Sequence, residues 1–243
     1  MKAIYKTNLL LIILALTFQS CNGVSSNNIV KGDGNVTVMT HDVAGFNSID
    51  LRGMFNVVLT ASETEKVVFE ADSNLHSHMT IEVKDNTLMV YTDRKSIYKP
   101  TKMDLHIYYV EIEEIVSGGA SKIKSTDCIV ADKLKFDLSG ATDLNLELNV
   151  SELVTNASGA SNLVFSGNAV SHDIDLSGAG SLKAENFSTV NTSINLSGAG
   201  SAHVFAAEAL NANISGVGSV YYSGNPINKN FSKSGLGKIK SMN

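Results

Sequence analysis

Proline, cysteine, tryptophan and charged residues are all scarce in this chain of 243 residues. It contains two prolines, two cysteines and no tryptophan, and 18% of its residues are charged, against about 25% in a typical globular domain. Two cysteines are too few for a disulfide framework or for the usual cysteine-rich zinc module. The formal net charge of -5 argues against nucleic-acid binding, which relies on a basic stripe. With 43% hydrophobic residues, the chain is nevertheless apolar enough to form a core.

A hydrophobic run long enough to span a membrane is also missing. The apolar run Leu9–Leu16 follows two lysines and is well short of the roughly 20 residues that a membrane helix needs. A basic start, a short apolar segment and a small residue, Ser20, are typical of a secretory signal peptide. Cys21 comes next and resembles the lipobox cysteine of a bacterial lipoprotein. We therefore expect residues 1–20 to be a signal peptide and Cys21 to be lipidated.

The residues before Cys21 depart from the usual lipobox, in which leucine stands three residues before the cysteine. Phe18 occupies that position and Gln19 follows it, which resembles the relaxed boxes of Bacteroidetes lipoproteins. Residues 21–37 are expected to form the lipidated cysteine and a flexible tether. The sequence thus predicts an exported lipoprotein of the outer membrane, and it leaves open whether the protein lies on the periplasmic or the surface face. The alternative is a secreted protein in which Cys21 is not lipidated.

Seven copies of a Gly-rich pentad organise the second half of the chain. The pentad Ser-Gly-Ala-Gly-Ser occurs at residues 177–181 and 197–201, and Ser-Gly-Val-Gly-Ser occurs at 215–219. Weaker copies begin at Ser117, Ser139, Ser158 and Ser234. Successive copies are separated by 22, 19, 19, 20, 18 and 19 residues. A nearly fixed period of this length is the signature of a repeat architecture.

Alternating apolar and polar residues surround the pentads. Residues 135–138, 173–176 and 193–196 have the period of two that is typical of strands with one buried face, and this half has no helical period. The predicted fold is all-β. We expect residues 116–243 to form a single-stranded, parallel, right-handed β-helix with rungs of about 19 residues.

The pentads are predicted to form recurring corners of this β-helix. Rungs stack about 4.8 Å apart, so a corner that requires positive φ or a close neighbouring backbone recurs on every rung and favours glycine. The predicted corner glycines are Gly140, Gly159, Gly178, Gly180, Gly198, Gly200, Gly216 and Gly218.

Residues 38–115 lack the pentad but also alternate as strands. The run 46–59 resembles one degenerate rung, and the run 66–71 resembles another. A hairpin is predicted about Asp85-Asn86, and residues 105–110 form a further strand. This half is more aromatic and more charged than the repeats. It is therefore expected to be an N-terminal β cap that protects the open end of the solenoid.

Several phrases of the sequence together resemble a known family. These are Gly45–Val57, Ala71–Leu75, Asp85–Leu88 and the repeated Ser-Gly-Ala-Gly-Ser. Over about residues 38–223 the chain is similar to the Bacteroidetes family of auto-transporter adhesins with a head GIN domain. The resemblance implies one continuous β-helix-like domain on a lipoprotein or signal-peptide-bearing protein, and it implies no catalytic residues.

Patterns typical of a metal or catalytic site are weak. His76 and His78, with Asp72 nearby, are the best metal candidate, but no third ligand has a diagnostic spacing. No Gly-x-Ser-x-Gly nucleophile elbow occurs. We therefore predict no metal and no cofactor. Cys128 has no partner in the mature chain and is expected to be a small buried hydrophobic residue.

Asp137 and Asp175, with Asp173 as a further member, are candidates for the paired carboxylates of a carbohydrate-active enzyme. They could align on one strand face beside the pentads, but Asn195 replaces the acid on the next rung, and an exposed polar ladder is the simpler interpretation. The sequence favours a non-catalytic cell-envelope lipoprotein, an adhesin or binding module whose solenoid binds a polysaccharide or an envelope or cell-surface protein. The alternatives are a β-helix enzyme that uses the Asp ladder and a purely structural role.

Overall fold

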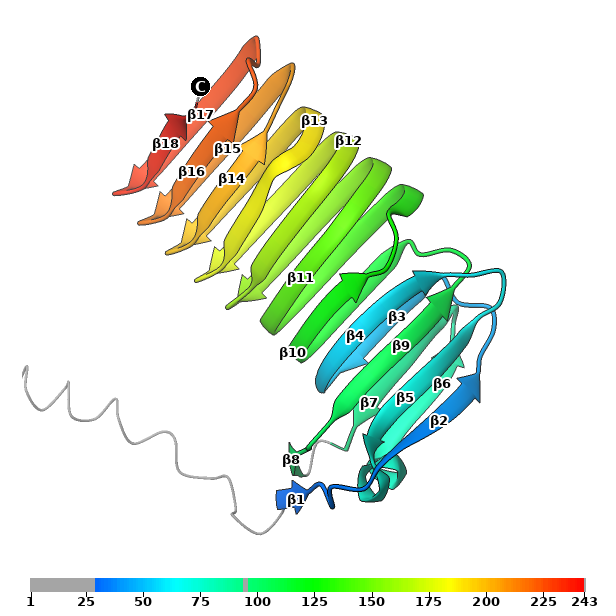
Figure 1. Ribbon diagram of the computed structural model, residues 1–243. Coiled ribbons are helices and arrows are strands. Elements are labelled where there is room, and N and C mark those ends of the chain that lie inside the picture. The colour runs from blue at the N-terminus through cyan, green and yellow to red at the C-terminus, as the bar shows by residue number, and fades with distance from the viewer. Residues whose placement is uncertain (1–28, 94–95, 243) are drawn as a thin grey trace, which may run out of the picture. The chain divides into compact units, whose positions relative to one another are not determined.

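The computed structural model describes residues 29–93 and 96–242 (Figure 1). The predicted signal peptide, Cys21 and the first part of the predicted tether lie outside these residues. The chain divides into two compact units. In the smaller unit, β1 (Ile29–Lys31) pairs in parallel with β8 (Ile97–Lys99). All the other described strands belong to the larger unit. No helix in the described part of the chain has the length and hydrophobicity of a membrane span.

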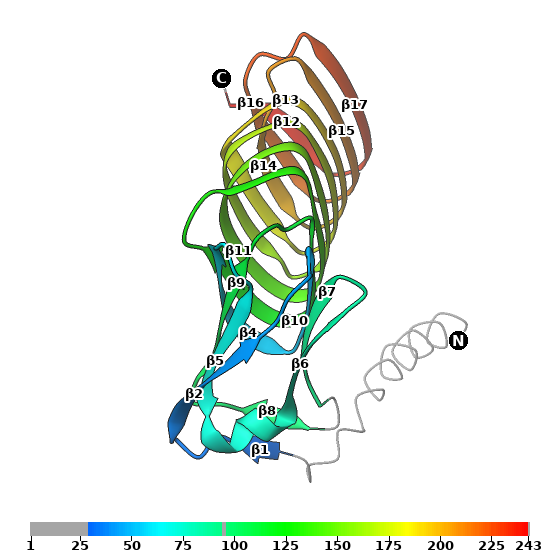
Figure 2. The same cartoon turned by 90° about the vertical axis from the view of Figure 1, so that its right-hand side faces the viewer.

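The second half of the larger unit is a β-solenoid of parallel stacked coils, as predicted, with about six turns. Figure 2 shows its coils stacked on one another. Its strands are β10 (Glu114–Ser125), β11 (Ile129–Gly159), β12 (Asn162–Gly178), β13 (Ser181–Gly198), β14 (Ser201–Phe205), β15 (Ala209–Gly216), β16 (Ser219–Ser223), β17 (Asn228–Gly235) and β18 (Lys238–Ser241).

Each rung presents two strand segments to the outside. In the rung formed by β12, residues 162–169 pair with the first segments of β11 and β13, and residues 171–178 pair with their second segments. The chain turns between the two segments at Val170 and leaves the rung at the pentad 177–181. We call the segments that follow a pentad the first wall of the solenoid, and those that precede the next pentad the second wall.

The core is built from inward residues that repeat at the same position of every rung. One such column is continuous along the first wall, and each of its members is at most 1% exposed. The column consists of Leu144, Leu163, Leu182, Ala202 and Val220. Burying each leucine contributes about 1.5–3 kcal/mol. Because consecutive members of a column contact one another, each rung depends on its neighbours for burial of its apolar face.

The pentads place their two glycines in different surroundings. The second residue of the pentad has positive φ from Gly140 to Gly235, with φ of 119° at Gly198. The fourth residue, for example Gly200, is not in this region of positive φ. A Cβ atom at Gly200 would nevertheless lie 2.6 Å from the carbonyl oxygen of Gly180 on the preceding rung. Glycine at the second position of the pentad is therefore favoured by both the backbone conformation and the lack of space for a side chain. Glycine at the fourth position is favoured by the lack of space alone.

The N-terminal strands continue the stack and then leave it. They are β2 (Val36–Asp42), β3 (Ser48–Arg52), β4 (Met54–Ala61), β5 (Lys66–Asp72), β6 (Met79–Lys84), β7 (Thr87–Thr92) and β9 (Met103–Tyr109), with a 3-10 helix, η1 (Ser73–His78), after β5. Both β3 and β4 pair in parallel with β10. The prediction that residues 46–59 form a rung is therefore confirmed.

The prediction that Lys66–Ala71 forms a second degenerate rung is wrong. These residues lie in β5, which pairs antiparallel with both β2 and β9. An alternating pattern identifies the buried face of a strand but not its direction, so this error could not be seen in the sequence. The predicted hairpin is confirmed, since β6 and β7 are antiparallel. Asp85 and Asn86 both have positive φ, at 50° and 59°, as a type I′ turn requires.

The last described rung has charged residues where other rungs have apolar ones. Lys229 and Lys233 on β17 occupy the positions of Leu210 and Ile214 on β15, which are at most 3% exposed. The Nζ atom of Lys229 lies 5.8 Å from the centroid of the Tyr222 ring. Both lysines are exposed, and charged residues on an edge strand oppose pairing with a further strand.

Candidate binding surface

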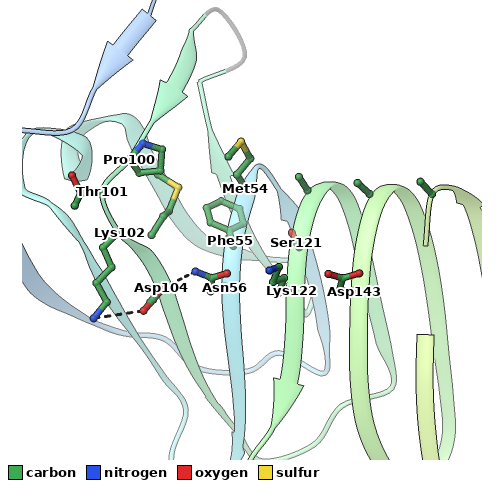
Figure 3. A pocket seen from close by; sticks show the side chains of 14 residues that line it. Met54, Phe55, Asn56, Pro100, Thr101, Lys102, Asp104, Ser121, Lys122 and Asp143 are labelled. Atoms are coloured by element: carbon green, nitrogen blue, oxygen red, sulfur yellow. Dashed lines mark hydrogen bonds and ion pairs between the residues drawn. The ribbon is translucent and has the colours of Figure 1, made fainter. Parts of the chain in front are cut away.

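A cleft of about 630 Å³ lies on the first wall, where β9 and β4 adjoin β10 (Figure 3). Asn56 on β4 donates a hydrogen bond of 2.8 Å from Nδ2 to Oδ1 of Asp104 on β9. The Nζ atom of Lys102 lies 2.8 Å from Oε2 of Glu70 and 3.6 Å from Oδ2 of Asp104. These contacts hold charged and amide side chains in place along the cleft, where they can form hydrogen bonds with a ligand.

The cleft is crossed by a row of outward polar residues, one from each successive strand. In order of strand pairing, the row consists of Asp104, Asn56, Lys122, Asp143, Asn162 and Ser181. We call it the polar row. The first four of these residues line this cleft. An adjoining cleft of about 560 Å³ is lined by the first five and extends to His106 and Val164. Together the two clefts run across the strands, which suits an extended ligand better than a compact one.

Asp137 and Asp175, the candidate catalytic pair, lie on the second wall with Asn156 between them. The three residues occupy successive outward positions and line a small cleft of about 240 Å³. Asn156 donates a hydrogen bond of 2.7 Å from Nδ2 to Oδ1 of Asp137, and the Nζ atom of Lys135 lies 2.5 Å from Oδ2 of Asp137. The structure therefore brings the two acids to one face, two rungs apart.

The environment of Asp137 is unfavourable for a general acid. Burial raises the pKa of this carboxyl, but the hydrogen bonds from Lys135 and Asn156 outweigh burial and hold the pKa below its ordinary value. A glycosidase acid needs a raised pKa so that it is protonated at neutral pH. The hydrogen bonds at Asp137 thus disfavour the role of general acid for this residue.

The candidate metal ligands Asp72, His76 and His78 do not form a metal site. Asp72 is fully buried and accepts hydrogen bonds from the backbone amides of Gly34, at 2.9 Å, and Thr101, at 2.7 Å. Burial raises the pKa of Asp72, but hydrogen bonds that include these two outweigh burial and leave the pKa below its ordinary value. Within residues 29–93 and 96–242, no group of three or more His, Cys, Asp or Glu side chains could hold a metal ion. Asp72 instead joins three segments of the chain.

Cys128 is a free thiol that is more exposed than expected, since it is only half-buried. Its Sγ atom lies 3.8 Å from the carbonyl oxygen of Ile129. Burial and the charge of Glu147 raise the pKa of the thiol, which disfavours the reactive thiolate.

His172 is a buried imidazole that the sequence patterns did not single out. His172 is 1% exposed, and its ring lies edge-on to Phe165 and Phe187, with ring centroids 6.0 and 5.5 Å apart. The Nε2 atom is 3.0 Å from Oγ1 of Thr155. Burial lowers the pKa of His172 to about 3. The signal was present in the sequence, because alternation from position 171 to 176 puts His172 on the same face as Ile174.

A pair of outward aromatic rings was also missed. His203 on β14 and Tyr221 on β16 are paired positions of neighbouring rungs, and their ring centroids are 4.8 Å apart with an interplanar angle of 34°. Both side chains are half-buried. They alternate with the inward residues Ala202 and Val220, so the pattern of the strands could have placed them on the surface.

Comparisons with known proteins agree with this architecture. A family model described as "Putative auto-transporter adhesin, head GIN domain" matches residues 45–226. No protein in the curated set matches the chain in sequence.

Several solved structures resemble the chain in fold, among them three from Bacteroides and Parabacteroides species. A protein described as a putative adhesin, from Bacteroides fragilis NCTC 9343, is 24% identical, with a TM-score of 0.85 over 88% of this chain and 100% of that one. One described as a putative lipid binding protein, from Parabacteroides distasonis ATCC 8503, is 17% identical, with a TM-score of 0.73 over the same shares. One described as a putative adhesin, from Parabacteroides merdae ATCC 43184, is 24% identical, with a TM-score of 0.67 over 89% and 100%. At these identities the likeness shows a shared fold.

Proposed function

We propose that this chain, which belongs to the family described as "Putative auto-transporter adhesin, head GIN domain", is a non-catalytic binding module of the cell envelope. Its solenoid surface would bind an extended ligand, namely a polysaccharide or a surface protein. The polar row carries the proposal, because it continues from β9 across the coils to β13 and its first four residues line both clefts. The lowered pKa of Asp137 supports binding over hydrolysis.

Binding and hydrolysis can be separated with the purified full chain. We expect it to bind at least one immobilised polysaccharide or envelope fraction without releasing reducing ends. Asp143→Ala, in the polar row, should weaken this binding about tenfold, which corresponds to about 1.4 kcal/mol. Asp173→Ala is the matched control, because it removes an exposed carboxylate from the second wall, and it should bind within about twofold of the wild type.

Two results would count against this function. Release of reducing ends that Asp175→Asn abolishes would establish the enzyme alternative. Failure of the wild-type chain to bind any polysaccharide or envelope fraction would favour a purely structural role.

We also propose that Cys21 attaches the protein to the outer membrane through its acyl chains. The support is the lipobox-like sequence before Cys21, and two or three acyl chains suffice for stable anchoring. The Cys21→Ser variant should move from the membrane fraction to the soluble fraction and lose labelling by a radioactive fatty acid. Cys128→Ser, the control at the other cysteine, should keep both properties. Retention of Cys21→Ser in the membrane fraction would contradict the proposal.

A further inference from the structure

A second row of outward residues lies on the first wall of the last rungs. Lys183 on β13, His203 on β14, Tyr221 on β16 and Lys240 on β18 occupy successive paired positions. We call it the basic aromatic row. It places two stacked rings between two lysines, and at a rung spacing of about 4.8 Å it is about 14 Å long.

The two rings are not needed to fill the core. The inward positions beside them are already occupied by Ala202, Val204 and Val220, each of which is at most 1% exposed. His203 and Tyr221 instead present a half-buried aromatic surface with polar atoms at its edge. Such a surface combines apolar contact with hydrogen bonding.

Charge is distributed unevenly around this row. Residues 209–242 contain four lysines and no aspartate or glutamate, whereas the whole chain has 24 acidic and 19 basic side chains. On the first wall of β13, β14, β16 and β18, among the described residues, Glu185 is the one carboxylate. An anionic polymer would be repelled by most of the protein and attracted to this part, and such complementarity selects partners by charge.

The neighbouring row is made of small polar residues. Ser181, Ser201 and Ser219 occupy its successive positions, and Lys238 follows them. Their hydroxyl groups can exchange hydrogen bonds with sugar hydroxyls. A membrane surface would instead call for large apolar side chains that insert between lipids, and this row has none.

We propose that the basic aromatic row binds an anionic polysaccharide whose chain runs along the solenoid axis. The C–H faces of the sugar rings pack on His203 and Tyr221, and Lys183 and Lys240 pair with carboxylate or sulfate groups of the sugars. This inference goes beyond the proposed function, because it makes the basic aromatic row a second binding surface, for an anionic ligand, beside the polar row.

The test is affinity gel electrophoresis of the purified full chain in gels that contain polygalacturonate, dextran sulfate or neutral dextran. The wild type should be retarded by one or both anionic polymers and not by dextran. Lys183→Gln/Lys240→Gln should weaken the binding about tenfold, and Tyr221→Ala should weaken it by a similar factor. The matched control is Lys84→Gln/Lys133→Gln, which removes the same charge from exposed positions outside both rows and should bind within about twofold of the wild type.

Three outcomes would overturn the inference. Both double lysine variants could weaken polymer binding equally, dextran alone could retard the protein, or neither anionic polymer could retard it. Tighter binding to phosphatidylglycerol vesicles than to the polymers, with the same dependence on Lys183 and Lys240, would assign the row to a membrane instead. In each case the proposed function would still stand if the protein bound another polysaccharide or envelope fraction and Asp143→Ala weakened that binding.

Discussion

We expect the Gly198→Val variant to unfold at a melting temperature about 10 °C below that of the wild type. Gly198 has a φ of 119°, and a Cβ atom there would lie 2.4 Å from the carbonyl oxygen of Gly178 on the preceding rung. That oxygen is fixed, because it accepts a hydrogen bond of 2.9 Å from the amide of Ala199. Valine would therefore combine backbone strain of about 1–3 kcal/mol with a steric overlap that side-chain rotation cannot relieve.

The damage should extend beyond the substituted corner. Gly178, Gly198 and Gly216 are paired positions of successive rungs, so a displaced corner on one rung also misplaces the next. Since each rung of a solenoid buries its apolar face only against its neighbours, we expect a loss of about 3 kcal/mol or more in the free energy of unfolding. Thermal unfolding followed by circular dichroism measures this effect.

The adjacent residue provides a matched control. Ala199 is exposed, and its counterpart on the next rung is Val217, which is 60% exposed. Ala199→Val adds the same two methyl groups to an alanine at a position where the fold already accepts valine, so its melting temperature should stay within about 2 °C of the wild type. An unchanged thermal transition for Gly198→Val would reject the requirement for glycine at this corner.

The solenoid could be predicted from the sequence because the repeat determines two things: how neighbouring rungs align with each other and which side chains point into the core. Each pentad fixes where a rung ends, and alternation in segments such as 173–176 fixes which side chains point inward. Together they predict which residues stack on neighbouring rungs. The hairpin at Asp85-Asn86 was equally predictable, because two consecutive residues that tolerate positive φ select a type I′ turn.

Strand direction and the ionisation of individual side chains could not be predicted from these patterns. β5 has the alternation of a rung, but its antiparallel pairing depends on β2 and β9, which are distant in the sequence. Asp137 has the spacing of a candidate catalytic acid, whereas its ionisation depends on Lys135 and Asn156. The clefts of the candidate surface also depend on which strands become neighbours, and so they appear only in the folded chain.

We expect the stability of the wild-type protein to fall by about 1.4 kcal/mol for each pH unit between about pH 6.5 and pH 4 on account of His172 alone. Burial lowers the pKa of His172 from 6.5 to about 3, so the unfolded chain takes up a proton on this residue before the folded protein does. Stability is therefore complete above about pH 6.5 and is lost progressively as the pH falls towards 3. Urea denaturation at a series of pH values measures the slope.

The pH range in which stability is lost separates His172 from the hydrogen-bonded carboxylates. Asp33, Asp72 and Asp137 have pKa values below the ordinary 3.8, so their contributions are lost only below about pH 4. The double variant His172→Leu/Thr155→Val removes both the imidazole and its hydrogen-bond partner and leaves no unpaired polar group from this pair. Its slope between pH 6.5 and 4 should be about 1.4 kcal/mol per pH unit shallower than that of the wild type.

Thr155→Val alone distinguishes the burial of the imidazole from its hydrogen bond. It removes the hydroxyl that lies 3.0 Å from Nε2 but leaves His172 between Phe165 and Phe187. Because desolvation is the cause of the lowered pKa, this variant should lose stability at every pH and keep the wild-type slope. A slope that flattens in Thr155→Val, or that persists in the double variant, would mean that a group other than the buried imidazole takes up the proton on unfolding.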